Sequence, residues 1–160
     1  MAIVLGLSPG TRSFGLAMFK ANKLVDWEMK THPEKWGDEK LKKILRYVSR
    51  YIDNYEIAQV AIKLPTELPI SSAYIQLVGS LNVLFERRGI PVHYYSLSDL
   101  KKHFCSQERP NKLDLAECMA SKHPHFIHTL YDKRMNSKVH NMKVLEAVAA
   151  ATYLLHLNSV

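Results

Sequence analysis

Several features that identify common protein classes are missing from this sequence. The only cysteines are Cys105 and Cys118, which do not form a Cys-x-x-Cys pair. We therefore expect free thiols in a reducing compartment rather than a disulfide scaffold. No stretch of eighteen apolar residues occurs, so no membrane-spanning helix is predicted. The apolar run at residues 3–7 is too short for a signal peptide, and no charged segment precedes it. These absences predict a cytoplasmic protein that does not associate with membranes.

Glycine-rich nucleotide-binding loops are also missing. The turn at Ser8-Pro-Gly10 is followed by a second apolar run at residues 14–19, which is typical of a strand rather than a helix. A Rossmann site needs a helix directly after its glycine loop, and a P-loop also needs Gly-Lys-Ser/Thr. The chain therefore opens with a predicted strand at residues 3–7, a tight turn and a second strand.

The composition is that of a globular protein with an excess of cations. The 160 residues are 47% hydrophobic and carry a formal net charge of +7, with a pI of about 9.4. A chain of this length can bury a core as one domain. The charge favours a polyanionic partner, although a merely soluble basic protein would have the same balance.

The rest of the chain predicts strands and helices in alternation. A turn at Ala21-Asn22 leads to a third strand, and later strands are expected at residues 58–62 and 91–95. A long helix is predicted at 72–88, capped by Ser71 or Ser72 and stopped by Gly89. The other predicted helices begin at Asp38, Ser98, Pro110 and Asn141. By itself this pattern gives only an α/β protein.

The opening hairpin resembles that of a known family. Leu5-Gly-Leu-Ser-Pro-Gly-Thr-Arg12, followed by Gly15-Leu16, is similar to the first two strands of the RNase H-like superfamily, and closest to RuvC-type Holliday-junction resolvases. The resemblance extends to the fourth strand with its helix, the segment at 96–112 and the final helix. It implies one RuvC-like domain over residues 1–160, with a mixed five-stranded sheet: three antiparallel strands, then parallel strands, with helices on both faces.

The resemblance implies four acidic positions that hold two divalent ions, and this sequence departs from three of them. The matching residues are Ser8, Lys63, Glu146 and Ala149. Metal ions of this kind need several convergent carboxylates, and only one remains. We therefore expect no catalytic residues and no cofactor. Mg²⁺ is expected only if other acids, such as Glu67, Asp114 or Glu117, have replaced those that were lost.

The family fold brings the end of the fourth strand against the start of the final helix. It therefore predicts that Lys63 lies beside Glu146, with Ser8 completing the cluster through a hydrogen bond. A buried ammonium or carboxylate group is costly alone and tolerable as a pair.

Basic residues flank the groove in which the family holds DNA. The candidate phosphate-binding residues are Arg12, Lys101, Lys102, Lys112, Lys133, Arg134, Lys138 and Lys143. The helix at 72–88 is equivalent to the one that forms the family's dimer interface, so a homodimer is expected through it.

Three hypotheses follow. The first is a catalytically degenerate RuvC-like protein, a pseudonuclease, that binds branched or duplex DNA without metal-dependent cleavage. The second is an active Holliday-junction resolvase with relocated metal ligands. The third is a protein-interaction module on the same fold, in which the positive charge is incidental.

Overall fold

The computed structural model describes residues 2–66, 69–126 and 138–159. Its centre is a five-stranded sheet of order β3-β2-β1-β4-β5. The strands are β1 (Ile3–Ser8), β2 (Ser13–Lys20), β3 (Lys23–Thr31), β4 (Ile57–Leu64) and β5 (Val92–Ser96). The first three strands pair antiparallel, whereas β4 and β5 join β1 in parallel. The predicted mixed sheet is therefore confirmed. The first four strands are one to three residues longer than predicted, and β5 has the predicted length but starts one residue later.

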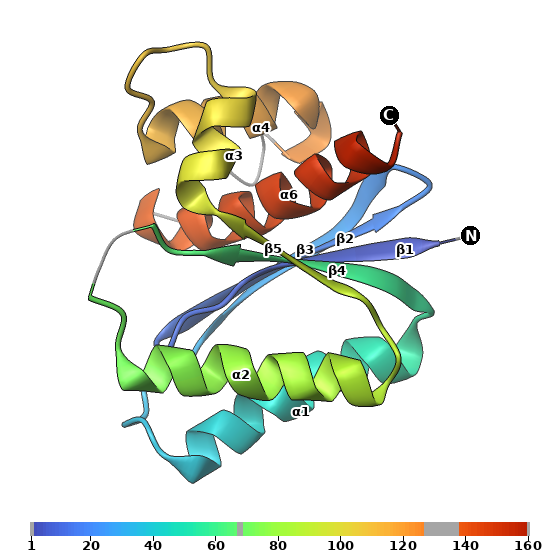
Figure 1. Cartoon of the computed structure of the whole chain (residues 1–160), viewed down its shortest axis with the longest axis vertical. Helices are drawn as coiled ribbons and strands as arrows, with labels where there is room; N and C mark the ends of the chain where they lie inside the picture. The colour runs from blue at the N-terminus through green and yellow to red at the C-terminus, as the bar shows by residue number, and fades with distance from the viewer. Residues whose placement is uncertain (1, 67–68, 127–137, 160) are drawn as a thin grey trace.

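Helices cover both faces of the sheet (Figure 1). One face carries α1 (Asp38–Asn54) and α2 (Ser72–Arg87). The other carries α6 (Lys138–Asn158), with α3 (Leu97–Phe104) and α4 (Lys112–Lys122) packed beyond it. A short 3₁₀ helix, η1 (Pro124–Phe126), follows α4. Among the described residues, no helix is long and apolar enough to cross a membrane.

The alternation of side chains along β1 divides the core into two layers. Leu5 and Leu7 pack in the cluster under α1 and α2, whereas Val4 packs in the cluster under α6. Because side chains alternate along a strand, Gly6 and Ser8 share the α6 face with Val4. In β4 the same alternation places Ala61 and Lys63 on the α6 face. The faces of these residues in β1 and β4 thus follow from the period of two along a strand.

Two glycines allow α6 to lie unusually close to the sheet. A Cβ atom at Gly6 would collide with the carbonyl oxygen of Ala147, and one at Gly15 would collide with that of Lys143. Both strands therefore need glycine where the backbone of α6 crosses them. This close crossing fixes the height of Glu146 above the end of β1.

Local sequence determined some element ends as predicted. The hydroxyl of Ser71 accepts a hydrogen bond from the backbone N–H of Tyr74 and caps α2. Gly89 follows the helix with a φ of 68°. The turn at Ala21 and Asn22 has positive φ at both residues, as a tight hairpin between twisted strands requires.

The predicted start of α1 at Asp38 is confirmed, but its predicted cap was wrong, and so were the predicted starts of α3, α4 and α6. Gly37, rather than Asp38, precedes α1, and Asp38 lies in the first turn without a capping hydrogen bond. Ser96, rather than Ser98, caps α3, and α6 already includes Asn141. The predicted start of α4 at Pro110 is replaced by a reciprocal cap between Asn111 and Asp114. At α3 and α4 several short polar residues stand near the start, and the caps are Ser96 and Asn111, whose backbones are extended.

Candidate functional site: a lysine cluster around one buried glutamate

The site lies at the end of the two central parallel strands. Leu7 of β1 is paired with Ile62 of β4, so the next residues, Ser8 and Lys63, emerge at the same edge of the sheet. Both side chains are on the face that α6 covers, and both residues are buried, Ser8 at 0% and Lys63 at 4% exposure. Strand pairing alone therefore brings together a hydroxyl and an ammonium group from distant parts of the sequence.

Glu146 on α6 completes the cluster. Its Oε2 atom lies 2.7 Å from Nζ of Lys63 and accepts a hydrogen bond of 2.8 Å from the hydroxyl of Ser8. Glu146 is only 2% exposed. The predicted pairing of Lys63 with Glu146, and the hydrogen bond from Ser8, are confirmed. A buried carboxylate is thus matched by a buried cation and a neutral donor.

Two further lysines approach the same carboxylate. Lys112, the first residue of α4, places Nζ 3.7 Å from Oε1 of Glu146. Lys143, one helical turn before Glu146, donates a hydrogen bond of 3.3 Å from Nζ to the carbonyl oxygen of Pro9. Three ammonium groups therefore surround a single carboxylate, and the cluster carries an excess of positive charge.

The pKa values of the cluster reflect this imbalance. Burial by itself raises the pKa of Glu146, but the charges of Lys63 and Lys143 and the hydrogen bonds from Lys63 and Ser8 outweigh it, so its pKa is lowered. Burial and the charges of Lys63 and Lys112 lower the pKa of Lys143 to about 8, against an opposing effect of Glu146. Glu146 is therefore ionised at neutral pH. An anion bound beside Lys143 would favour the protonated form of Lys143.

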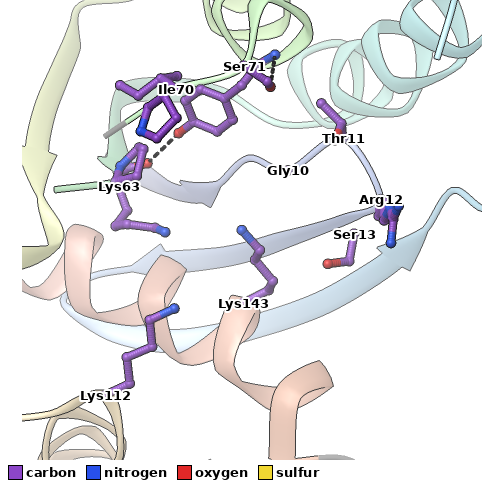
Figure 2. Close-up of a pocket in the computed structure, with 12 residues that line it drawn as sticks. Gly10, Thr11, Arg12, Ser13, Lys63, Ile70, Ser71, Lys112 and Lys143 are labelled. Atoms are coloured by element: carbon purple, nitrogen blue, oxygen red, sulfur yellow. Dashed lines mark hydrogen bonds between the residues drawn. The ribbon is translucent and has the colours of Figure 1, made fainter. Parts of the chain in front are cut away.

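A pocket of about 460 Å³ opens above the cluster. Figure 2 shows the side chains of Lys63, Lys112 and Lys143 extending toward the same space, with Arg12 from the β1–β2 turn and Ser13 at the start of β2 at its far side. No Asp or Glu is among the described residues that line the pocket. The lining also includes the hydroxyl-bearing residues Thr11, Ser13, Ser71 and Tyr74, together with Gly10, Pro65, Pro69 and Ile70. The charge of the described lining is therefore positive.

The donor set does not fit a divalent metal ion. Oxygen ligands with negative charge are required, but Oε2 of Glu146 is occupied by Lys63 and Ser8, and Oε1 faces Lys112. Across the part of the chain that the structure describes, no three His, Cys, Asp or Glu side chains gather in a way that could hold a metal.

Neither Ala149 nor the acids considered as substitutes place a further carboxylate among the described residues that line this pocket. Ala149 is fully buried in the apolar cluster under α6. Asp114 is used in the cap of α4. Glu117 is not among the residues that line the pocket, and Glu67 lies outside the described residues.

The structure brings together only some of the predicted phosphate-binding residues. Arg12, Lys112 and Lys143 line the pocket, whereas Lys101 and Lys102 of α3 do not. Lys133 and Arg134 lie outside the described residues, and the side chain of Lys138 does as well. The sequence analysis missed the ring of hydroxyls. The position of Thr11 and Ser13 on either side of Arg12, a predicted phosphate-binding residue, could have indicated that their hydroxyl groups line the same site.

A double-mutant cycle tests the coupling within the buried pair. Glu146→Gln removes the carboxylate and leaves the ammonium group of Lys63 buried without its partner. We expect this change to lower the free energy of unfolding at pH 7 by about 3–5 kcal/mol. In Lys63→Met/Glu146→Gln neither charge is buried, and most of this loss should be regained. Urea unfolding of the wild type, both single variants and the double variant measures the coupling. Additive single effects would show that the two charges are energetically independent.

Comparisons with known proteins are consistent with this geometry. No family model matches the sequence. The chain is 28% identical over 117 residues to the crossover junction endodeoxyribonuclease RuvC of Corynebacterium diphtheriae, an alignment that covers 68% of this chain and 72% of that protein. It is 26% identical over 118 residues to the RuvC of Corynebacterium glutamicum, where the alignment spans 68% of this chain and about half, 53%, of the relative.

A solved structure shares the whole architecture. Thermus thermophilus RuvC in complex with a Holliday-junction substrate superposes with a TM-score of 0.71, over 99% of this chain and 96% of that chain, at 20% sequence identity. The sequence similarity and the superposition together agree with the hairpin motif and the strand order. The chain is therefore a RuvC-like protein with the RNase H-like fold.

Proposed function

We propose that this chain is a single RuvC-like domain that binds branched or duplex DNA through its lysine cluster and does not cleave it. The observation that carries the proposal is the buried ion pair between Lys63 and Glu146. It stands where the family resemblance implies two metal ions. A cation supplied by the protein has replaced cations that would have been bound from solution.

The chemistry of the cluster favours holding a phosphate over attacking it. Lysine ammonium groups attract and hydrogen-bond to phosphate oxygens. They do not generate a hydroxide nucleophile at neutral pH or stabilise both oxygens of an in-line displacement, as a pair of metal ions does. With Lys63, Lys112 and Lys143 at the pocket and no acid in its described lining, the site retains attraction for the backbone without the means of cleavage.

The relatives support DNA as the partner. The curated relatives are named crossover junction endodeoxyribonucleases, and the superposed Thermus structure contains a Holliday-junction substrate. The net charge of +7 is of the sign that a phosphate backbone attracts. Two alternatives predict different outcomes in the experiments below: an active resolvase with Mg²⁺ held by relocated ligands, and a module that binds a protein instead of DNA.

The protein should not cleave Holliday junctions or linear duplexes in Mg²⁺ or Mn²⁺. The physical reason is that one carboxylate, already bound by Lys63, cannot hold two divalent ions. Gel assays on labelled junctions measure this, with Glu146→Ala as the matched preparation. Cleavage that EDTA abolishes and that Glu146→Ala lacks would establish the active resolvase. Equal cleavage by both preparations indicates a contaminating nuclease.

DNA binding should be strong at low salt and weaken steeply as salt is added. Each phosphate contact on duplex DNA lowers log K by about 0.9 per unit of log salt. Lys112→Gln/Lys143→Gln should therefore weaken binding and flatten the slope by up to about two units, and Lys101→Gln/Lys102→Gln tests the flanking helix in the same way.

The matched control removes two charges from the opposite end of the sheet. Lys20→Gln/Lys23→Gln has the same change in net charge at an exposed hairpin and should leave the slope nearly unchanged. No retention of junction or duplex DNA by the wild type even at low salt would favour the protein-interaction module.

Binding should also weaken at alkaline pH through Lys143. Its pKa of about 8 means that the free protein loses this charge as the pH rises through 8. A bound phosphate stabilises the protonated form, so binding takes up a proton and affinity falls by at most about tenfold per pH unit above 8. Lys143→Arg keeps its charge and should bind with little change between pH 7 and 9. The same fall in Lys143→Arg as in the wild type would assign the effect to another group.

We further propose that two copies of the chain associate through α2. This helix exposes Ile75 and Val83, at 61% and 44%, although its opposite side is fully buried. A Cβ atom at Gly79 would meet nothing within 4 Å, so a second helix has room to approach there. Apolar exposure on one face of a helix is typical of an association surface.

Light scattering at micromolar concentration should report twice the mass of the chain. Val83→Glu should give a monomer, because a charge in an apolar contact is left unpaired. Leu113, exposed at 46% on α4, supplies the control, since Leu113→Glu should leave the mass unchanged. A monomeric wild type would contradict the dimer without affecting the DNA-binding proposal for a single domain.

A further inference from the structure

A second basic pocket lies on the other face of the sheet. It is formed where β3 ends against α1 and has a volume of about 310 Å³. Its lining shares no residue with the pocket at the lysine cluster. Its lining includes Thr31, Tyr47 and four cations, which are Lys30, Lys43, Arg46 and Arg50.

The cations of this pocket are only partly neutralised. Lys30 pairs with Glu28, and Lys43 pairs with Glu34, through exposed side chains. Arg46 and Arg50, one helical turn apart on α1, have no ion pair with any residue that the structure describes. Neither acid is among the residues that line the pocket, so its described lining carries four cations and no carboxylate.

His32 provides an independent indication that a ligand belongs here. The residue lines the pocket, is 2% exposed, and has both ring nitrogens buried without a hydrogen-bond partner. A histidine ring carries at least one N–H in every protonation state, so a donor is left unsatisfied. Such a buried donor destabilises the protein unless something accepts from it. A hydrogen bond of 2.6 Å from the backbone N–H of His32 to the carbonyl oxygen of Arg12 fixes the residue in place.

We propose that this pocket is a second anion site and that it binds a phosphate group, with His32, Arg46 and Arg50 as its donors. A guanidinium group presents two parallel N–H donors, which match two oxygens of a phosphate. The imidazole N–H of His32 would donate a hydrogen bond to a third phosphate oxygen, which would give the buried ring the partner that it lacks. This inference does not depend on the proposed function, because none of these residues takes part in the lysine cluster.

The phosphate can belong to a nucleic acid or to a small phosphorylated molecule. The two pockets are joined by the β1–β2 turn, since Arg12 lines the first pocket and its carbonyl oxygen accepts from His32. A DNA strand that passes over this turn would reach both. The chemistry of recognition is the same for either source, and the experiment separates them.

The ionisation of His32 supplies a direct readout. Burial and the charges of Lys43, Lys40 and Lys30 lower the pKa of His32, against an opposing effect of Glu34. A phosphate bound beside the ring adds negative charge and should raise that pKa. The ring resonances of His32, followed by NMR as the pH is varied, report the change at the site itself.

The test is a titration of the full chain with inorganic phosphate at constant ionic strength, observed through the His32 ring. We expect saturable shifts in the wild type and a dissociation constant at least about tenfold weaker in Arg46→Gln/Arg50→Gln. Both arginines are exposed, so this variant should fold normally. Lys20→Gln/Lys23→Gln, with the same change in net charge at the far end of β3, should bind phosphate as the wild type does.

A duplex oligonucleotide forms the second arm. Shifts of His32 that DNA produces, and that Arg46→Gln/Arg50→Gln loses, would assign the phosphate to nucleic acid. Phosphate binding without such shifts would assign it to a small molecule. Phosphate shifts that do not saturate, or that are equal in the arginine variant and the wild type, would overturn the proposal.

Discussion

The buried ion pair between Lys63 and Glu146 is the interaction on which the rest of the site depends. Its two partners are almost fully excluded from solvent and 2.7 Å apart. Removing either charge leaves the other in a low-dielectric interior, which is far more costly than burying both. The pair therefore constrains both positions together: a site with Lys63 needs Glu146, and the hydrogen bond from Ser8 supports that carboxylate.

This pair also determines what the site can attract. In a site with four carboxylates, negative charge must be balanced by bound cations before a phosphate can approach. Here one carboxylate is already neutralised by Lys63, and Lys112 and Lys143 add positive charge that no described acid in the pocket opposes. The charge of this pocket is thus opposite in sign to that of a site with four carboxylates. Affinity for phosphate needs positive charge, whereas two-metal cleavage needs several convergent carboxylates, and the described lining of the pocket includes none.

The framework itself depends on the close crossing of α6 over the sheet. Gly6 and Gly15 let the helix backbone approach β1 and β2, and the carbonyl group of Ala147 and the methyl group of Ala151 lie in the contact with Gly6. Glu146 reaches Ser8 only because of this approach. The second pocket is separate from that crossing and lies under α1, but it shares the β1–β2 turn, through the hydrogen bond from His32 to Arg12. One short turn therefore borders both positively charged sites.

The sequence by itself determined the strands, their buried faces and the fold class. The hairpin motif around Ser8 and Gly10 and the apolar run ending at Lys63 are local patterns, and their period of two follows from strand geometry. Combined with the family resemblance, they were enough to pair Lys63 with Glu146. Helix starts were less predictable, because neighbouring polar residues such as Ser96 and Ser98 compete for the same cap.

Only the tertiary structure decided how the charges are distributed in space. The i, i+3 spacing of Lys143 and Glu146 places these two side chains near each other on one helix. Nothing in the sequence around Lys112 indicates that it approaches the same carboxylate from α4. The burial of His32 also depends on tertiary packing. This residue lies in the loop between β3 and α1, which has no periodic pattern, and its pocket is formed by residues of both elements. Burial and electrostatic potential are sums over long-range neighbours, so they arise only when the chain has folded.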